Sequence, residues 1–307
     1  MIDERIRPAA LKPGDTVAIV APAAAIERDH LKRGVDVLSA CGYRVKVSER
    51  VLSRAGILAG GDRERAAELQ HSFDDPEVKA IFAARGGYGC GRLLPLLDFD
   101  AIAREPKIFL GFSDATFLLN ALVELSGMVC FHGPMVAMDF ARGLSRRSLD
   151  HLRALLAGEA GAFELEARDS LHPGVAEGEL IGGCLSVLVA MLGTPYAPDF
   201  DGKILFLEDT GEKAYRIDRM LVHLKQAGAL GRVAGVVFGG MRGFDGSEQE
   251  KRLTREFISE QTADLGCPVV TGIEVGHGTE NLTIPFGVRV RLDAERRRLV
   301  FVGSAVS

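Results

Sequence analysis

Short apolar runs alternate with amphipathic stretches along the first half of the chain. The spacing of apolar residues predicts helices, for example over residues 26–41 and from Asp62 to Phe73. Buried strands are predicted at residues 15–21, 43–47, 78–84, in the run that ends at Gly111, and at 129–132. Strands and helices that alternate with short links are typical of a parallel sheet covered on both faces. We therefore expect an α/β domain of Rossmann or flavodoxin-like type over residues 1–150.

The pattern changes after this first domain. Residues 139–160 predict a mostly polar helix, and residues 161–177 have no strong periodicity, so 151–177 are expected to form a linker. Beyond it, apolar runs predict strands at 203–207, 233–238, 269–270, 287–292 and 299–302, with helices at 185–192, 215–226 and 247–264. We expect residues 178–307 to form a smaller, β-rich C-terminal domain.

Composition narrows the class of protein. The 307 residues are 47% hydrophobic and 26% charged, as in ordinary globular proteins, and the formal net charge is -5. The chain has no long basic run, which argues against a nucleic-acid partner. It also has no apolar segment of transmembrane length and no N-terminal apolar stretch of signal-peptide type. We therefore expect no membrane partner and a cytoplasmic location.

Cysteine and histidine spacing gives no sign of a metal site. The five cysteines are scattered and form no C-x-x-C pair, so neither a zinc ribbon nor a disulfide framework is predicted. No H-E-x-x-H motif is present. The sequence therefore predicts no metal and no other cofactor.

Ser113 lies at the corner between the strand ending at Gly111 and a helix that begins at Asp114. A serine on such a turn exposes its hydroxyl at the end of a sheet, beside helical amides that stabilise negative charge. This is the arrangement of a nucleophile elbow, although the usual G-x-S-x-G pattern is incomplete because Ala115 holds the last position. The alternative, which this stretch alone favours, is that Ser113 or Asp114 caps the helix.

A glycine-rich loop, Arg85–Arg92, follows another predicted strand. Parallel topology would bring this loop and Ser113 to the same edge of the sheet. A dinucleotide-binding G-x-G-x-x-G does not fit, because its last glycine would fall on Arg92 and the loop does not follow the first strand. Two interpretations stay open: a plain tight turn, or amides that bind an oxyanion beside Ser113.

A serine nucleophile needs a base, and two histidines have suggestive positions. His277 lies between Gly276 and Gly278, where packing gives no reason for a histidine. His132 ends a predicted strand just before Gly133. We favour His277 as the base and keep His132 in reserve.

The base in turn needs an acid that orients it. Glu208 and Asp209 end a predicted strand, whereas Glu274 and Glu280 lie on loops close to His277 in sequence. A carboxylate on a strand is held rigidly, so we favour Glu208 as the acid. We expect Asp209 to cap a turn.

Six motifs, taken together and in this order, resemble those of the LD-carboxypeptidases, serine peptidases grouped with the microcin C7 self-immunity hydrolases. The motifs lie at residues 85–89, 111–116, 132–134, 182–186, 207–219 and 276–278. The resemblance extends from Lys12 to about Gly287. One departure is Cys184, where many members of that family have asparagine.

The resemblance implies a serine peptidase with Ser113 as nucleophile, Glu208 as acid and His277 as base. The oxyanion hole would be formed by the amide of Asp114 together with one from the Gly86-Gly87 turn. The implied reaction releases the terminal D-alanine from murein tetrapeptide, or from a related small peptide, during peptidoglycan recycling in the cytoplasm. The resemblance further implies an α/β domain with a β-rich C-terminal domain, a homodimer, and no cofactor.

The substrate of this reaction is anionic at its D-alanine end, so a cation should face it, and we select Arg85 and Arg216 as candidates. Two rival functions stay open. One is a microcin C7-type hydrolase of peptidyl nucleotides, which the absence of tryptophan disfavours because an adenine platform would be aromatic. The other is a non-catalytic α/β ligand-binding protein in which Ser113 merely caps a helix.

Overall fold

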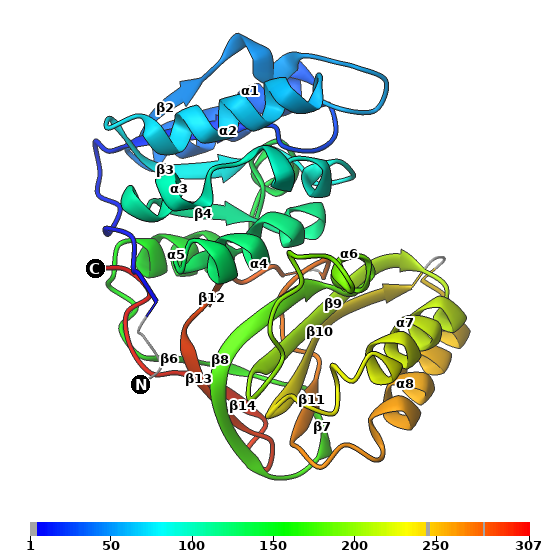
Figure 1. The fold of residues 1–307 in the computed structure, drawn as a ribbon. Coiled ribbons are helices and arrows are strands. Elements are labelled where there is room, and N and C mark those ends of the chain that lie inside the picture. The colour runs from blue at the N-terminus through cyan, green and yellow to red at the C-terminus, as the bar shows by residue number, and fades with distance from the viewer. Residues whose placement is uncertain (1–4, 244–245, 279) are drawn as a thin grey trace. The chain divides into compact units, whose positions relative to one another are not determined.

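The structure is a computed structural model that describes residues 5–243, 246–278 and 280–307 (Figure 1). Most of the N-terminal stretch used above to argue against a signal peptide, residues 1–4, lies outside these ranges. The chain forms two compact units. Unit 1 comprises Met1–Ala160, Leu282–Gly287 and Ser304–Ser307, and unit 2 comprises Gly161–Asn281 and Val288–Gly303.

A mixed sheet forms the centre of unit 1. Its strands, as far as the chain is described, are β1 (Thr16–Val20), β2 (Arg44–Val47), β3 (Val78–Ala83), β4 (Ile108–Gly111), β5 (Cys130–His132) and β12 (Ile284–Phe286), in the order β12-β5-β4-β3-β1-β2. The first five strands are parallel, whereas β12 pairs antiparallel with β5. The central strands β1 and β4 are buried along their whole length, which explains their continuous apolar sequences. The predicted α/β fold class is thus confirmed.

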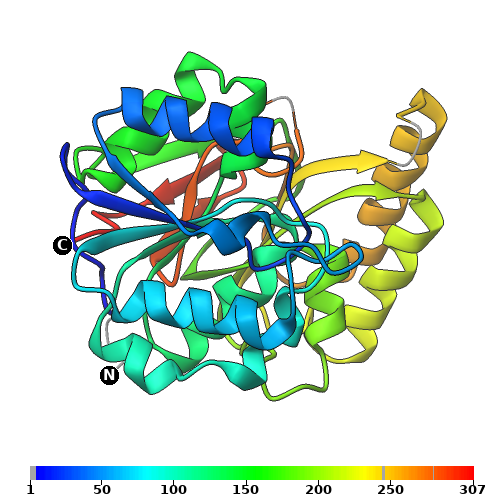
Figure 2. The same cartoon turned by 90° about the horizontal axis from the view of Figure 1, so that it is seen from above.

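Helices cover both faces of this sheet. They are α1 (Arg28–Ala40), α2 (Asp62–Asp74), α3 (Phe99–Arg104), α4 (Thr116–Leu125) and α5 (Arg146–Leu156). Figure 2 shows α1 and α2 on opposite sides of the strands. The single helix predicted over residues 139–160 was wrong, because Val136–Phe140 forms a separate π-helical turn and Gly143 follows with a φ of 97°. The α5 helix starts afresh after Ser145, whose side chain accepts the Ser148 N–H.

Unit 2 is built on a second mixed sheet. Within the described ranges its strands are β6 (Phe163–Glu166), β7 (Asp169–His172), β8 (Val175–Cys184), β9 (Ile204–Glu212), β10 (Gly235–Gly243), β11 (Val269–Thr271), β13 (Arg289–Asp293) and β14 (Arg298–Phe301), in the order β6-β14-β13-β8-β9-β10-β11-β7. Strands β8 to β11 are parallel to one another. The neighbours β7 and β13 pair antiparallel with β11 and β8.

Residues 151–177, predicted as a linker, hold the end of α5, both β6 and β7, and the start of β8. The strands β6 and β7 have mixed polar sequences because they form the two edges of the sheet, where several of their side chains stay exposed. Their pairing partners, β14 and β11, lie roughly 100 or more residues further along the chain. The local sequence therefore does not predict β6 and β7.

The helices that accompany the parallel strands of unit 2, as far as its residues are described, are α6 (Leu185–Met191), α7 (Ala214–Gln226) and α8 (Glu248–Thr262). Figure 1 shows α7 and α8 lying side by side next to β9 and β10, and their residues contact one another. Among the residues described, no helix combines the length and the apolar character that a membrane crossing requires.

Candidate active site

Ser113 has a left-handed backbone. It follows β4 and opens a short 3-10 turn, Ser113–Ala115, that leads into α4. Its φ is 60°, and Arg297, with a φ of 56°, is the one other non-glycine residue of the described chain with a positive φ. A non-glycine residue with this φ costs about 1–3 kcal/mol, and such strain concentrates at functional sites. The serine therefore sits on a strained strand-to-helix turn.

This geometry excludes the helix-cap interpretation of the same stretch. A capping residue has an extended backbone and accepts a helical N–H with its side chain. The residue before the 3-10 turn is Phe112 and the residue before α4 is Ala115, and neither position has a side-chain cap. The first glycine of the pattern has a local reason, because Ala115 is fully buried and a Cβ at Gly111 would lie 3.0 Å from Ala115 Cβ.

The glycine loop after β3 lies against this serine. A Cβ built on Gly86 would lie 2.9 Å from Ser113 Cβ, 3.1 Å from Ser113 Oγ and 3.3 Å from the Asp114 amide nitrogen. Any side chain at Gly86 would therefore collide with the Ser113 side chain. The next residue, Gly87, has a φ of 103°, and a Cβ there would lie 2.8 Å from Ala24 Cβ. The glycines let the backbone approach the serine hydroxyl closely.

Two buried charged side chains fix the glycine loop. The Asp114 carboxylate accepts the Cys90 N–H at 2.8 Å, and burial raises the pKa of this carboxyl. The Arg65 side chain is 1% exposed, donates to the carbonyl oxygens of Gly89 and Pro22, and pairs with Asp62 at 2.6 Å. The loop is thus fixed by hydrogen bonds to side chains on α2 and on the serine turn itself.

Unit 2 holds a histidine–carboxylate pair. Glu208 lies within β9 and is fully buried, while the His277 side chain is 18% exposed. The Glu208 Oε2 atom lies 2.6 Å from His277 Nδ1 and accepts the His277 backbone N–H at 3.0 Å. Because an ionised carboxylate can only accept, the proton of a neutral imidazole sits on Nδ1, which makes Nε2 the basic nitrogen.

The loop that carries His277 depends on glycine. Gly276 has a φ of 92°, and a Cβ there would lie 2.5 Å from Glu208 Oε2. Its N–H donates to the Asn281 side-chain oxygen at 2.8 Å. On the neighbouring strand, a Cβ on Gly240 would lie 3.0 Å from the Gly278 nitrogen. Gly276 and Gly240 therefore allow the His277 loop to pack directly against Glu208.

The residues next to Glu208 have structural roles. Asp209 accepts the Ser186 N–H at the start of α6 at 2.7 Å, which agrees with the capping role expected for it, and burial raises its pKa to about 6. Cys184, the departure from the family pattern, is paired with Glu208 in the β8–β9 register. Burial, together with the charges of Glu208 and Asp209, raises the pKa of the Cys184 thiol well above its usual value. This thiol therefore stays protonated and is a poor nucleophile.

The remaining candidates have clear surroundings. His132 is fully buried, with its ring 5.6 Å from those of Phe112 and Phe286 between centroids, so burial limits its access to a ligand. Arg85 is partly buried and donates to the Ala25 carbonyl oxygen at 3.2 Å. Arg216 is exposed and pairs with Glu212 at 3.3 Å.

Sequence reasoning missed two contributors to these sites. Arg65 was not singled out, because an arginine in a polar helix gives no sign of burial. The Asp114 side chain was considered only as a cap, although it anchors the glycine loop. Within the described ranges no three His, Cys, Asp or Glu side chains gather as metal ligands would.

A strained serine beside close-packed backbone amides, and an imidazole oriented by a buried carboxylate, are the components of hydrolases that use covalent catalysis. Comparison with known proteins gives the family. Residues 17–133 match the LD-carboxypeptidase N-terminal domain and residues 177–292 match the LD-carboxypeptidase C-terminal domain. The chain belongs to the LD-carboxypeptidase family of enzymes.

Individual relatives match over nearly their whole length. The murein tetrapeptide carboxypeptidase of Pseudomonas aeruginosa is 34% identical over 294 residues, which cover 92% of this chain and 94% of that protein. The crystal structure of muramoyltetrapeptide carboxypeptidase from Oxalobacter formigenes has a TM-score of 0.83 at 34% identity, covering 93% of this chain and 97% of that one. The microcin C7 self-immunity protein MccF of Escherichia coli is 27% identical over 325 residues, covering 95% and 94%.

Proposed function

We propose that this enzyme is a serine LD-carboxypeptidase that releases the terminal D-alanine from murein tetrapeptide. The names of the Pseudomonas and Oxalobacter relatives support the substrate. The main support for the mechanism is the 2.6 Å contact between His277 Nδ1 and the buried Glu208 carboxylate, because this contact orients the imidazole to act as a base.

In the proposed reaction Ser113 Oγ attacks the carbonyl carbon of the peptide bond before D-alanine. His277 accepts the hydroxyl proton and transfers it to the nitrogen of the leaving D-alanine, which departs as a free amino acid. Water then attacks the acyl-enzyme ester, with His277 again as base, and the shortened peptide leaves. Glu208 keeps the proton on Nδ1 and stabilises the imidazolium that forms in each step.

The negative charge on the substrate oxygen needs backbone donors in both steps. We propose the Asp114 N–H and an N–H of the Gly86-Gly87 turn for this role, since a Cβ on Gly86 would lie only 3.3 Å from the Asp114 nitrogen. Loss of one such donor costs about 3–4 kcal/mol of transition-state stabilisation. Arg85 and Arg216 stay our candidates for binding the D-alanine carboxylate, and their contacts with Ala25 and Glu212 would have to rearrange.

The test is release of D-alanine from purified murein tetrapeptide, measured with a D-amino-acid oxidase coupled assay. We expect the wild-type protein to release D-alanine and Ser113→Ala to reduce kcat on the order of 10⁴-fold or more. Ser39→Ala, an exposed serine on α1, is the matched control and should leave the rate unchanged. If Ser113→Ala releases D-alanine as fast as the wild type, Ser113 is not the nucleophile. No release by the wild type from any LD-peptide would remove the proposed substrate class.

A second candidate is hydrolysis of peptidyl nucleotides, which the 27% identity to the microcin C7 self-immunity protein supports. The chain has no tryptophan to stack on a nucleobase, which favours the murein peptide instead. Parallel assays with a peptidyl adenylate analogue and murein tetrapeptide decide between them by the ratio of kcat/KM values.

The setting of this reaction is part of the proposal. We propose that the enzyme acts as a homodimer in the cytoplasm, where it would recycle peptidoglycan fragments. Sedimentation analysis of the purified chain tests the dimer, and a monomer at micromolar concentration would contradict it. Accumulation of tetrapeptide in cells that lack the gene tests the recycling role.

A further inference from the structure

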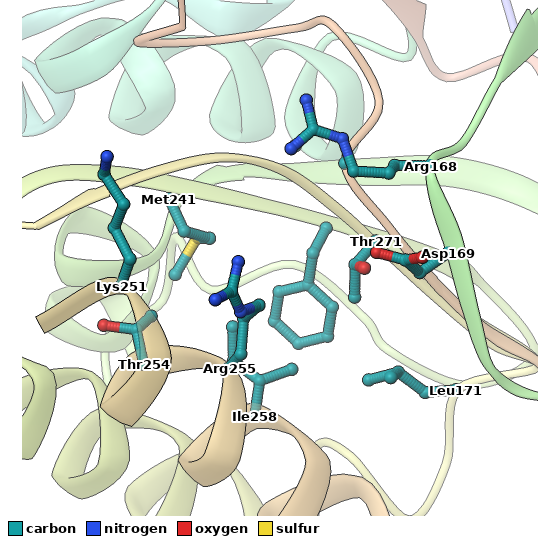
Figure 3. Close-up of a pocket in the computed structure, with 12 residues that line it drawn as sticks. Arg168, Asp169, Leu171, Met241, Lys251, Thr254, Arg255, Ile258 and Thr271 are labelled. Atoms are coloured by element: carbon teal, nitrogen blue, oxygen red, sulfur yellow. The ribbon is translucent and has the colours of Figure 1, made fainter. Parts of the chain in front are cut away.

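Unit 2 contains a cavity of about 270 Å³ between α8 and the β10, β11 and β7 strands (Figure 3). Its walls are formed by Arg168, Asp169, Leu171, Phe238, Gly239, Met241, Lys251, Thr254, Arg255, Ile258, Thr271 and Gly272. The volume lies just below the roughly 300–1,000 Å³ typical of sites for drug-sized ligands, so a ligand here would be small. Neither Glu208 nor His277 lines it.

Arg168 is held by its backbone while its side chain faces the cavity. The Arg168 N–H donates to the Thr271 carbonyl oxygen at 2.9 Å, and its own carbonyl accepts from Arg297 at 2.9 Å. A Cβ on Gly272 would lie 2.7 Å from Arg168 Cβ, so a glycine there permits this close packing. The guanidinium makes no hydrogen bond or ion pair with any other residue that the structure describes, and Figure 3 shows it extending over the cavity.

Two more cations come from α8. Lys251 and Arg255 are four residues apart, and this spacing places both on the cavity side of the helix. Two like charges at this spacing repel each other and destabilise the helix. Glu248 offsets part of this cost through its 2.6 Å pair with Lys251, whereas Arg255 has no ion-pair partner in the described part of the chain. An anion bound among these side chains would relieve the repulsion.

The other residues that line the cavity are acidic or uncharged rather than basic. Figure 3 shows the Asp169 carboxylate and the Thr271 side chain together on the side away from Lys251. The floor is apolar, with Leu171 and Ile258 below the guanidinium of Arg255. The cavity therefore has two cations on the α8 side, Arg168 and the Asp169 carboxylate on the opposite wall, and apolar surface between these walls.

We propose that this cavity binds a small zwitterion, a free amino acid with an apolar side chain. Its carboxylate would pair with Arg168 and Arg255, for which the planar guanidinium is well suited. Its ammonium would face Asp169, and its side chain would cover the apolar floor. The site is separate from the His277–Glu208 pair, and its existence does not depend on the proposed peptidase reaction.

Isothermal titration of the full-length protein with L-leucine tests the proposal, because L-leucine has no peptide bond that the enzyme could cut. We expect one saturable site per chain. N-acetyl-L-leucine lacks the ammonium and L-leucinamide lacks the carboxylate, so each should bind at least tenfold more weakly. The absence of saturable binding, or equal binding of all three compounds, would overturn the proposal.

Variants locate the binding. Arg168→Met and Arg255→Met should each weaken L-leucine binding at least tenfold, and Asp169→Asn should do the same. Arg252→Met is the matched control, because Arg252 lies on the same helix outside the cavity and pairs with Glu256 at 3.6 Å. Thermal unfolding of each variant verifies that it is folded. Equal weakening by Arg252→Met would contradict the proposal.

A last variant separates this site from the catalytic groups. His277→Ala should bind L-leucine as tightly as the wild type while it loses D-alanine release. If His277→Ala abolishes L-leucine binding, the amino acid occupies the proposed catalytic site and the cavity assignment is wrong. A wild type that binds L-leucine but releases no D-alanine would count against the peptidase function alone.

Discussion

Gly276→Ala is the substitution whose effect the structure determines most directly. The residue has a φ of 92°, and its missing Cβ would lie 2.5 Å from Glu208 Oε2, 2.6 Å from Glu208 Cγ and 2.7 Å from Glu208 Cδ. The Glu208 side chain is fully buried and cannot move into solvent to relieve the collision. We expect the His277 loop to move away from Glu208 instead.

Two contributions set the loss of stability. The left-handed backbone costs an alanine about 1–2 kcal/mol. Forcing an extra carbon into a packed site costs about 1–3 kcal/mol more. We therefore expect Gly276→Ala to lower the free energy of unfolding by about 3 kcal/mol, measured by urea denaturation at equilibrium. A displacement of His277 by about 1 Å should in addition lower kcat for D-alanine release about 100-fold.

Two glycines of unit 2 separate these contributions. Gly193 has a φ of 78° with nothing within 4 Å of its missing Cβ, so Gly193→Ala should show the backbone cost alone. Gly266 has open space and no positive φ, so Gly266→Ala should change the unfolding free energy by less than about 0.5 kcal/mol. If Gly276→Ala matches Gly193→Ala in both stability and kcat, contact with Glu208 does not control the loop and the reasoning fails.

Three further predictions concern buried charges. Glu208→Gln should lower kcat by about 10³–10⁴-fold with little change in KM, measured by D-alanine release, because glutamine cannot stabilise the imidazolium. The raised pKa of Asp209 means that the folded protein binds more protons than the unfolded chain between pH 3.8 and about 6. The Asp209 contribution to stability is thus lost as pH rises through about 6, and Asp209→Asn should flatten urea-melt stability against pH in that window. Arg65→Met should cost about 3 kcal/mol in the same melts, since it removes the Arg65 donor from the Gly89 and Pro22 carbonyl oxygens and leaves Asp62 paired with Arg92 alone.

Local sequence signals were sufficient for most elements of the fold. The strands β1, β3 and β4 are continuous apolar runs because both of their faces are covered, and this burial is visible in the residues themselves. The turn at Ser113 was also visible, since an apolar run meets a helical pattern there. The break before α5 was not predicted, although Gly143, which has a φ of 97°, is a residue type that often ends a helix.

The strands that the sequence did not predict pair with partners far away along the chain. Apolar and polar residues alternate only weakly in strands β6 and β7. These strands pair with β14 and β11, which lie far along the chain, so their own sequences resembled a linker. Strand β12 comes from the C-terminal part of the sequence yet pairs with β5 in unit 1. Such contacts depend on the folding of the whole chain, and a window of ten or fifteen residues contains no information about them.

By itself, the sequence determined which residue types were available for chemistry: a serine at a strand end, a histidine between two glycines, and several carboxylates. The sequence also favoured Glu208 among these carboxylates, but only the tertiary structure created its contact: folding brings Glu208 Oε2 within 2.6 Å of His277 Nδ1 across 69 positions, while Asp209 accepts the Ser186 N–H of α6. The tertiary structure also gave Ser113 its left-handed backbone and placed Gly86 against it. The physical reason is that hydrophobicity and propensity act locally along the chain, whereas hydrogen bonds, backbone strain and close packing depend on segments that meet only after folding.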